Sequence, residues 1–259
     1  MPAIAGFGRG PLSLPSQLKV RRFSYCFMAI VASRASPVFL GGEPDNLEAH
    51  AMGPIQCIPF APGPAGAHVG SSPFYYLSLT GITVGDTRLP FNASAFALKG
   101  DGSGGMIIDS GTAVMTFPRA VFRSLSEAFV AQVPLLRPSA RAHARAVANG
   151  SADPDGRLCF SISPMKKAPA VPKLILHLDG ADWDLPRDNY VLELDEDVVD
   201  TGRELCVEYI RQARATGRPS ATFSSRTCTS SMTWRATRWS LCPGAATSSE
   251  LYSLCDHPM

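Results

Sequence analysis

The sequence predicts a mainly β fold with one or two short helices. Several short runs are rich in aromatic or β-branched residues and are bounded by turn residues, as strands are; the clearest are 22–27, 74–84 and 106–108. In contrast, only the stretch after Pro118 places apolar residues at helical spacing. The chain has 259 residues, 45% of them hydrophobic and 18% charged, which suits one large globular domain or two small ones.

Composition and charge argue against several classes of function. The formal net charge of +2 gives no electrostatic reason to expect nucleic acid or membrane partners. No apolar run approaches the roughly 20 residues of a membrane-spanning helix. The seven cysteines include no Cys-x-x-Cys pair, so we expect no metal site and no cofactor. The N-terminus lacks the charged and apolar regions of a signal peptide, so none is expected in this chain.

The first half of the chain alternates strands with turn-rich loops. Residues 1–18 are dense in Gly, Pro and Ser, and the alternating, aromatic-rich segment 22–27 is the first expected strand. The segment 74–85 contains two strands that meet at a glycine. We interpret Tyr75 and Tyr76 in that segment as core residues.

A helix is expected after residue 117. Pro118 suits its first turn, because its missing N–H would have no partner there. An apolar stripe at helical spacing should pack on the sheet and carries no chemistry; it consists of Val121, Phe122, Leu125 and Phe129. The following segment, 135–156, is expected to be a solvated, partly helical insertion.

The second half contains two cysteine-bearing strands and a half-buried strand between them. Residues 157–160 and 204–207 are interpreted as paired strands. Between them, 173–178 alternates apolar and polar residues, as a half-buried strand does. His177 falls on the polar phase of that strand and is expected at the surface.

The most informative stretch is 104–117, where a buried strand ends in an acid. The apolar residues 106–108 precede Asp109, and a carboxylate at such a place is costly to bury without hydrogen bonds. Suitable donors follow at once, namely the hydroxyls of Ser110 and Thr112 and the backbone N–H of Gly111. Gly111 also permits backbone conformations that a side chain resists. An Asx-type turn that merely closes the strand is the alternative interpretation.

The sequence Asp109-Ser110-Gly111-Thr112 after a hydrophobic strand resembles the catalytic aspartate loop of pepsin-type aspartic proteases. Residues 104–114 resemble its second, C-terminal-lobe copy in the plant nepenthesin-like branch, and 74–85 and 4–18 resemble further family segments. The resemblance implies a pepsin-like acid protease lobe, the C-terminal lobe of a bilobal β-barrel fold, over residues 36–210. Residues 1–35 would be a remnant of the N-terminal lobe and the lobe junction.

The family mechanism needs two aspartates, one from each lobe, and the resemblance makes Asp109 the C-terminal-lobe member. Ser110, Gly111 and Thr112 would support that catalytic loop. The first aspartate and the flap would lie before the start of this chain. The resemblance therefore implies an aspartic-type endopeptidase in a truncated form that carries one of the two catalytic aspartates. The isolated chain is expected not to cleave a peptide or protein substrate unless a second Asp-bearing lobe is supplied.

The resemblance also implies how the chain is processed and where it resides. The family has a disulfide between similarly placed positions, which predicts a bond between Cys159 and Cys206. Its members are secreted, apoplastic or vacuolar. Asn-x-Ser sequons at Asn92 and Asn149 are possible N-glycosylation sites and suit such an oxidising secretory compartment.

The texture of the sequence changes near residue 211. Residues 211–259 contain six arginines, no lysine and two acids, and they lack apolar periodicity, which is typical of disorder. The family continues at this point with Gly-Asn-Phe-Gln-Gln-Gln-Asn-Met-His-Val. A DNA string that encodes this segment, read one base later, gives Ala-Thr-Phe-Ser-Ser-Arg-Thr-Cys-Thr, which are the residues at 221–229. We therefore expect 211–259 to be an out-of-frame, disordered tail.

Two other functions fit the same resemblance. A non-catalytic pepsin-fold binding protein of the xylanase-inhibitor-like kind would share the sheets but would have a degraded aspartate motif. The intact motif at Asp109 favours a protease ancestry. An inactive pseudogene product is the third interpretation, because loss of the late strands would leave sheet edges open.

Overall fold

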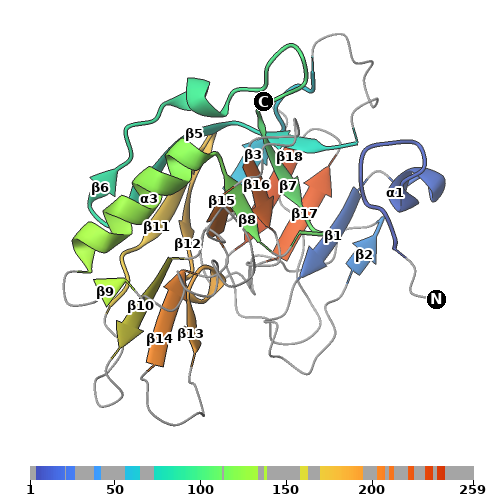
Figure 1. The fold of residues 1–259 in the computed structure, drawn as a ribbon. Helices are drawn as coiled ribbons and strands as arrows, with labels where there is room; N and C mark the ends of the chain where they lie inside the picture. Colours follow the sequence, from blue (N-terminus) through green and yellow to red (C-terminus); the bar gives the residue numbers. More distant parts are fainter. Residues whose placement is uncertain are drawn as a thin grey trace, which may run out of the picture.

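The computed structural model confirms a mainly β fold (Figure 1). It describes residues 4–20, 22–26, 38–41, 56–64, 73–112, 114–133, 137–138, 158–162, 170–194, 203–207, 210–212, 221–224, 231–235 and 238–242. The helices of this part are short except for one; they are α1 (Leu14–Gln17), α3 (Arg119–Gln132) and the 3₁₀ helices η1 (Ala93–Phe96) and η2 (Arg187–Asn189).

The strands of the described part form four sheets. For each sheet, the strands are named in the order in which they lie side by side. The first is β2 (Val38–Leu40), β1 (Arg22–Cys26), β17 (Ser231–Arg235), β18 (Arg238–Cys242) and β3 (Gln56–Pro59). The second is β13 (Leu192–Leu194), β14 (Arg203–Val207), β10 (Leu158–Ile162) and β9 (Arg137–Pro138). The third is β12 (Ala181–Leu185), β11 (Leu174–Leu178), β5 (Leu79–Val84) and β6 (Thr87–Arg88). The fourth is β15 (Ile210–Gln212), β8 (Met115–Phe117), β16 (Ala221–Ser224), β7 (Met106–Asp109) and β4 (Tyr75–Leu77).

The fourth sheet is mixed, whereas the other three are antiparallel. In it, β7 pairs antiparallel with β4 on one side and parallel with β16 on the other. Figure 1 shows this sheet in the middle of the molecule, with β1, β2 and α1 on one side and α3 on the other. The position of β7 between two partners fixes the strand that ends at Asp109.

The expected helix is confirmed, with a small correction at its start. Val121, Leu125 and Phe129 are buried in α3, and Phe122 is partly buried against the same core. Pro118 precedes the helix as its N-cap residue, with an extended ψ of 149°, and does not lie in the first turn. The C-terminal end of α3 is also bound to β5, because Gln132 Nε2 donates a hydrogen bond to the Val84 carbonyl at 2.7 Å.

The side chain of His177 is more covered than the polar phase of its strand predicts. Only 15% of it is exposed, and it joins three neighbouring strands. One ring nitrogen, Nε2, lies 2.7 Å from the hydroxyl of Thr83 on β5. The other, Nδ1, lies 2.7 Å from a carboxylate oxygen of Asp182 on β12. The polar phase of a strand thus predicts polarity but not exposure, because neighbouring strands can cover it.

The structure has strands within 211–259, the segment for which the sequence predicts disorder. Strands β16, β17 and β18 all lie in this segment. Strand β16 separates β7 from β8, and β17 and β18 lie between β1 and β3. The out-of-frame origin concerns the gene and stays a prediction. Thr, Phe and Trp in these stretches favour strands whatever the reading frame that encoded them.

The insertion expected at 135–156 is described only at two residues. Arg137 and Pro138 form β9, which pairs with β10, so this part is extended and not helical. Asn149 and the rest of the insertion lie outside the described residues.

Replacing Phe129 by alanine should lower the free energy of unfolding by about 3–5 kcal/mol, because the side chain is fully buried and leaves a cavity. Phe129→Ala should shift the midpoint of denaturant-induced unfolding accordingly. The neighbouring Val130→Ala is the matched control, because Val130 is 37% exposed, and should change the same quantity by about 0.5 kcal/mol or less. Equal effects of the two changes would contradict the placement of the helix.

Deleting residues 213–259 should destabilise the chain, because β7 and β8 would lose the strand that pairs with both. We expect a lower denaturant midpoint or loss of a cooperative transition, followed by circular dichroism. Deletion of 243–259 keeps all described strands and is the comparison. An unchanged midpoint after the longer deletion would contradict this prediction and would show that residues 213–259 do not stabilise the fold.

Candidate active site

Asp109 lies where the apolar run of β7 ends. The preceding residues Met106, Ile107 and Ile108 are 1%, 5% and 7% exposed, so the strand is buried almost to its last residue. Asp109 itself is partly exposed. Its partner in the register is Ser224 of the parallel strand β16. A buried, doubly paired strand therefore holds this carboxylate at its boundary with solvent.

Both carboxylate oxygens of Asp109 accept hydrogen bonds from the next turn. The backbone N–H of Gly111 donates to Oδ1 at 2.8 Å. The hydroxyl of Thr112 donates to Oδ2. Two donors compensate for much of the solvation that the carboxylate loses, and they fix its orientation.

Gly111 is needed in this loop for space. A Cβ atom at this position would lie 3.2 Å from Oδ1 of Asp109, which is tighter than an ordinary contact. The close approach of the backbone N–H to the carboxylate is therefore easiest with no side chain. The sequence suggested a conformational reason for the glycine, and the structure gives a steric one.

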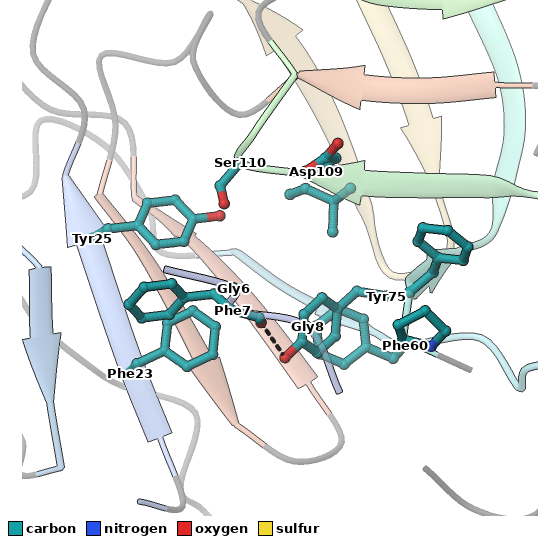
Figure 2. Close-up of a pocket in the computed structure, with 12 residues that line it drawn as sticks. Gly6, Phe7, Gly8, Phe23, Tyr25, Phe60, Tyr75, Asp109 and Ser110 are labelled. Atoms are coloured by element: carbon teal, nitrogen blue, oxygen red, sulfur yellow. Dashed lines mark hydrogen bonds between the residues drawn. The ribbon is translucent and has the colours of Figure 1, made fainter. Parts of the chain in front are cut away.

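Ser110 occupies a different place from the other two loop residues. Figure 2 shows its hydroxyl directed into a pocket, toward the hydroxyl end of Tyr25 on β1. Gly111 and Thr112 are the residues that donate to the carboxylate. The supporting role expected of Ser110 stays a prediction.

The pocket beside Asp109 and Ser110 has a volume of about 280 Å³ and mostly apolar walls (Figure 2). Six aromatic side chains line it, namely Phe7, Phe23, Tyr25, Phe60, Phe74 and Tyr75. They come from the N-terminal segment, β1, the residue after β3, and β4 with the residue before it. Tyr76 is 3% exposed, as expected of a core residue, whereas Tyr75 lies on the opposite face of the strand and in the pocket.

The N-terminal segment forms one wall of the pocket, and Tyr75 holds it there. The hydroxyl of Tyr75 donates to the Phe7 carbonyl at 2.8 Å. The backbone N–H of Arg9 donates to the Pro73 carbonyl at 3.1 Å, and its guanidinium lies 6.0 Å from the centre of the Tyr75 ring. Burial raises the pKa of Tyr75 well above its usual value, so the hydroxyl keeps its proton and stays a donor.

The residues flanking this wall are unusually exposed. Ile4 is 98% exposed and Leu12 is 86% exposed, although both are large and apolar. The segment Ile4-Ala5-Gly6 begins the stretch 4–18 that resembles the end of the family's N-terminal lobe. Its exposure shows that the described part of this chain provides no surface to cover it.

The predicted disulfide rests on two strands that do pair. In the register of β10 with β14, Cys159 lies directly opposite Cys206. Such an antiparallel arrangement brings the two backbones to the separation that a disulfide needs. The bond itself stays a prediction.

The described residues offer neither a metal centre nor a membrane anchor of the helical kind. No group of three or more His, Cys, Asp or Glu side chains in that part could hold a metal ion. Likewise, no helix of that part is long and apolar enough to cross a membrane.

A family profile described as "Xylanase inhibitor C-terminal" matches residues 74–224, which is more than half of the chain. Nepenthesin-1, an aspartic proteinase of Nepenthes gracilis, is 37% identical over 191 residues, covering 73% of this chain and 39% of the relative. Aspartyl protease family protein 2 of Arabidopsis thaliana is 34% identical over 214 residues, covering 80% of this chain and 38% of the relative. The chain belongs to the nepenthesin-like, pepsin-type aspartic protease family.

Solved structures agree at the level of the fold. The structure of edgp has a TM-score of 0.66 at 17% identity, covering 93% of this chain and 59% of that one. Basic 7S globulin from soybean has a TM-score of 0.63 at 19% identity, covering 93% of this chain and 58% of that one. The chain thus spans about two fifths of the length of the curated relatives, and less than two thirds of these structures.

The hydroxyl of Thr112 should contribute about 1–2 kcal/mol to the free energy of unfolding, because it donates a hydrogen bond to the partly buried carboxylate of Asp109. Thr112→Val keeps the shape and removes the donor, so it should lower the free energy of unfolding by that amount. Thr112→Ser keeps the donor and should lose less. Urea titrations of the three proteins make the comparison, and a valine variant as stable as the parent would contradict this account of the loop.

Proposed function

We propose that this chain supplies one of the two catalytic carboxylates of an aspartic-type endopeptidase. The observation that carries the proposal is the carboxylate of Asp109, held on both oxygens beside a pocket that is open to a substrate. Membership of the protease family supports it, since relatives of which this chain spans about two fifths are named aspartic proteases.

The chemistry requires a second carboxylate facing the first. One carboxylate takes a proton from a water molecule as the water oxygen attacks the peptide carbonyl. The other, protonated, donates a hydrogen bond to the carbonyl oxygen, and the two groups share one proton because close like charges do not both ionise. Asp109 provides one member of this pair. A second Asp-bearing lobe must provide the other, and the substrate is then a peptide or protein bound between the lobes.

The geometry of the described part is compatible with a site in which each lobe provides one carboxylate. The aromatic pocket is lined on one side by the N-terminal segment, which resembles the other lobe, and on the other by the loop of Asp109. Exposed apolar residues next to that wall, Ile4 and Leu12, offer contacts for a covering lobe. We therefore propose that the isolated chain does not cleave peptide bonds.

Adding a separately expressed N-terminal lobe of a nepenthesin-type relative should create acid protease activity that needs Asp109. The measurement is cleavage of a quenched fluorescent peptide by the assembly and by each part alone. Asp109→Asn should lower the rate by at least about 10²-fold, because the carboxylate is lost. Asp101→Asn is the matched control, because that exposed acid accepts from Ser103 in a turn of similar design, away from the pocket.

Two outcomes would contradict the proposal. One is cleavage by the purified monomer alone, and the other is an assembly in which Asp109→Asn is as active as the parent. If a dimer of this chain were active without the added lobe, the second Asp-bearing lobe would be a second copy. Size-exclusion chromatography of the active fraction separates that case from the monomer.

A second candidate is a non-catalytic binding protein of the xylanase-inhibitor-like kind. The description of the matching family profile favours it. It requires a stable fold and a binding surface but no carboxylate chemistry, so Asp109→Asn would leave its function intact. An inactive pseudogene product, the third candidate, would show no cooperative unfolding transition.

We also propose that the protein resides outside the cell or in the vacuole, in a secreted, apoplastic or vacuolar compartment. Its membership of a family of plant aspartic proteases supports this location.

A further inference from the structure

The turn that carries one of the two sequons is well described. Asn92 begins the sequence Asn-Ala-Ser and is the N-cap residue of η1. Asn92, Ala93 and Ser94 are all exposed. The aromatic residues on either side anchor the turn, because Phe96 is 3% exposed and the Phe91 ring packs against it at 6.5 Å between centroids.

The hydrogen bonds of this turn involve the amide oxygen of Asn92, Oδ1, and not its amide nitrogen, Nδ2. The backbone N–H of Ser94 donates to Oδ1 of Asn92 at 3.1 Å, and the Ser94 hydroxyl donates to the same oxygen at 2.6 Å. Glycosylation takes place at the other amide atom, Nδ2. The cap of η1 therefore persists when Nδ2 carries a sugar, because Oδ1 stays a carbonyl oxygen.

We propose that Asn92 is an acceptor for N-linked glycan. The co-substrate is a lipid-linked oligosaccharide of the secretory pathway. A bond forms between Nδ2 and the anomeric carbon of the first sugar while the bond from that carbon to the lipid pyrophosphate breaks. The pyrophosphate leaves with the electron pair, and Nδ2 gives up one proton. This site requires the secretory location proposed above but does not depend on proteolysis.

The site is compatible with a working substrate pocket. None of the residues that line the pocket beside Asp109 belongs to the turn at 92–94. The turn lies in the connection between β6 and β7, on the surface and not in a sheet. A glycan there has room to extend into solvent without displacing packed side chains.

The chain offers two changes that remove the sequon while keeping the cap. Asn92→Asp keeps Oδ1 as the acceptor for the Ser94 N–H and removes the nitrogen that takes the sugar. Ser94→Ala removes the hydroxyl that the sequon needs and keeps the backbone N–H. Ser94→Thr keeps both features. Asn149→Gln eliminates the other sequon, so that the two sites are read separately.

The test is translation of the full chain, behind an added cleavable signal peptide, in a cell-free system with microsomes. This arrangement measures acceptor competence without relying on the natural route to the secretory pathway or on proteolytic activity. We expect a mobility shift that peptide N-glycosidase reverses, with conversion of Asn92 to aspartate detected by mass spectrometry. The shift should persist in Asn149→Gln and in its combination with Ser94→Thr, and disappear when Asn149→Gln is combined with Asn92→Asp or Ser94→Ala.

An Asn149→Gln chain that enters the microsomes, shown by protection from added protease, yet carries no sugar at residue 92 would overturn the proposal. The same result would leave the proposed endopeptidase function standing, because that function is tested by complementation with an added lobe. Secretion of the full chain from insect cells gives a second measurement, in which an unmodified peptide containing Asn92 in the folded product would also overturn it.

Discussion

The central constraint on the described structure is the carboxylate of Asp109 at the end of the buried strand β7. Burying three apolar residues in β7 carries the chain to Asp109 at the edge of the core, where an unpaired charge would be costly. Two donors from the next turn meet that cost, and both come from the three residues that follow. Because β4 and β16 pair with β7 on both sides, the sheet fixes the backbone that carries the carboxylate. The sheet thus sets the position of Asp109, and the loop that follows sets the orientation of its carboxylate.

The features that could be predicted from the sequence are those set by neighbours along the chain. The loop of Asp109 is local, since its donors lie within three residues, and the residue types alone indicated it. The stripe through Val121 and Phe129 defined α3 because 3.6-residue periodicity is a local property. The pairing of the two cysteine strands was also anticipated, because family resemblance supplied a long-range link that periodicity cannot give.

The features that could not be predicted depend on distant partners. The pocket joins the Phe7 carbonyl to the Tyr75 hydroxyl across 68 positions, and alternation in β4 shows only that Tyr75 and Tyr76 face opposite ways. His177 has a polar strand phase, yet Thr83 and Asp182 from neighbouring strands cover it. In the segment after residue 211, composition indicated disorder, whereas the structure pairs β16 with β7, β17 with β1 and β18 with β3, and composition carries no information on such distant partners.

The link between Tyr75 and the N-terminal segment has a further consequence for a two-lobe site. Phe7 and Arg9 are tied to β4 and to Pro73 by hydrogen bonds of 2.8 and 3.1 Å. Strand β4 in turn pairs with β7, so only two steps of hydrogen bonding separate the segment from Asp109. A covering lobe that packs on the exposed Ile4 would be positioned relative to Asp109 through this chain of contacts. In the two-lobe enzyme proposed above, shared protonation would require the two carboxylates to be close, so the hydrogen bond of Tyr75 would help to set their separation.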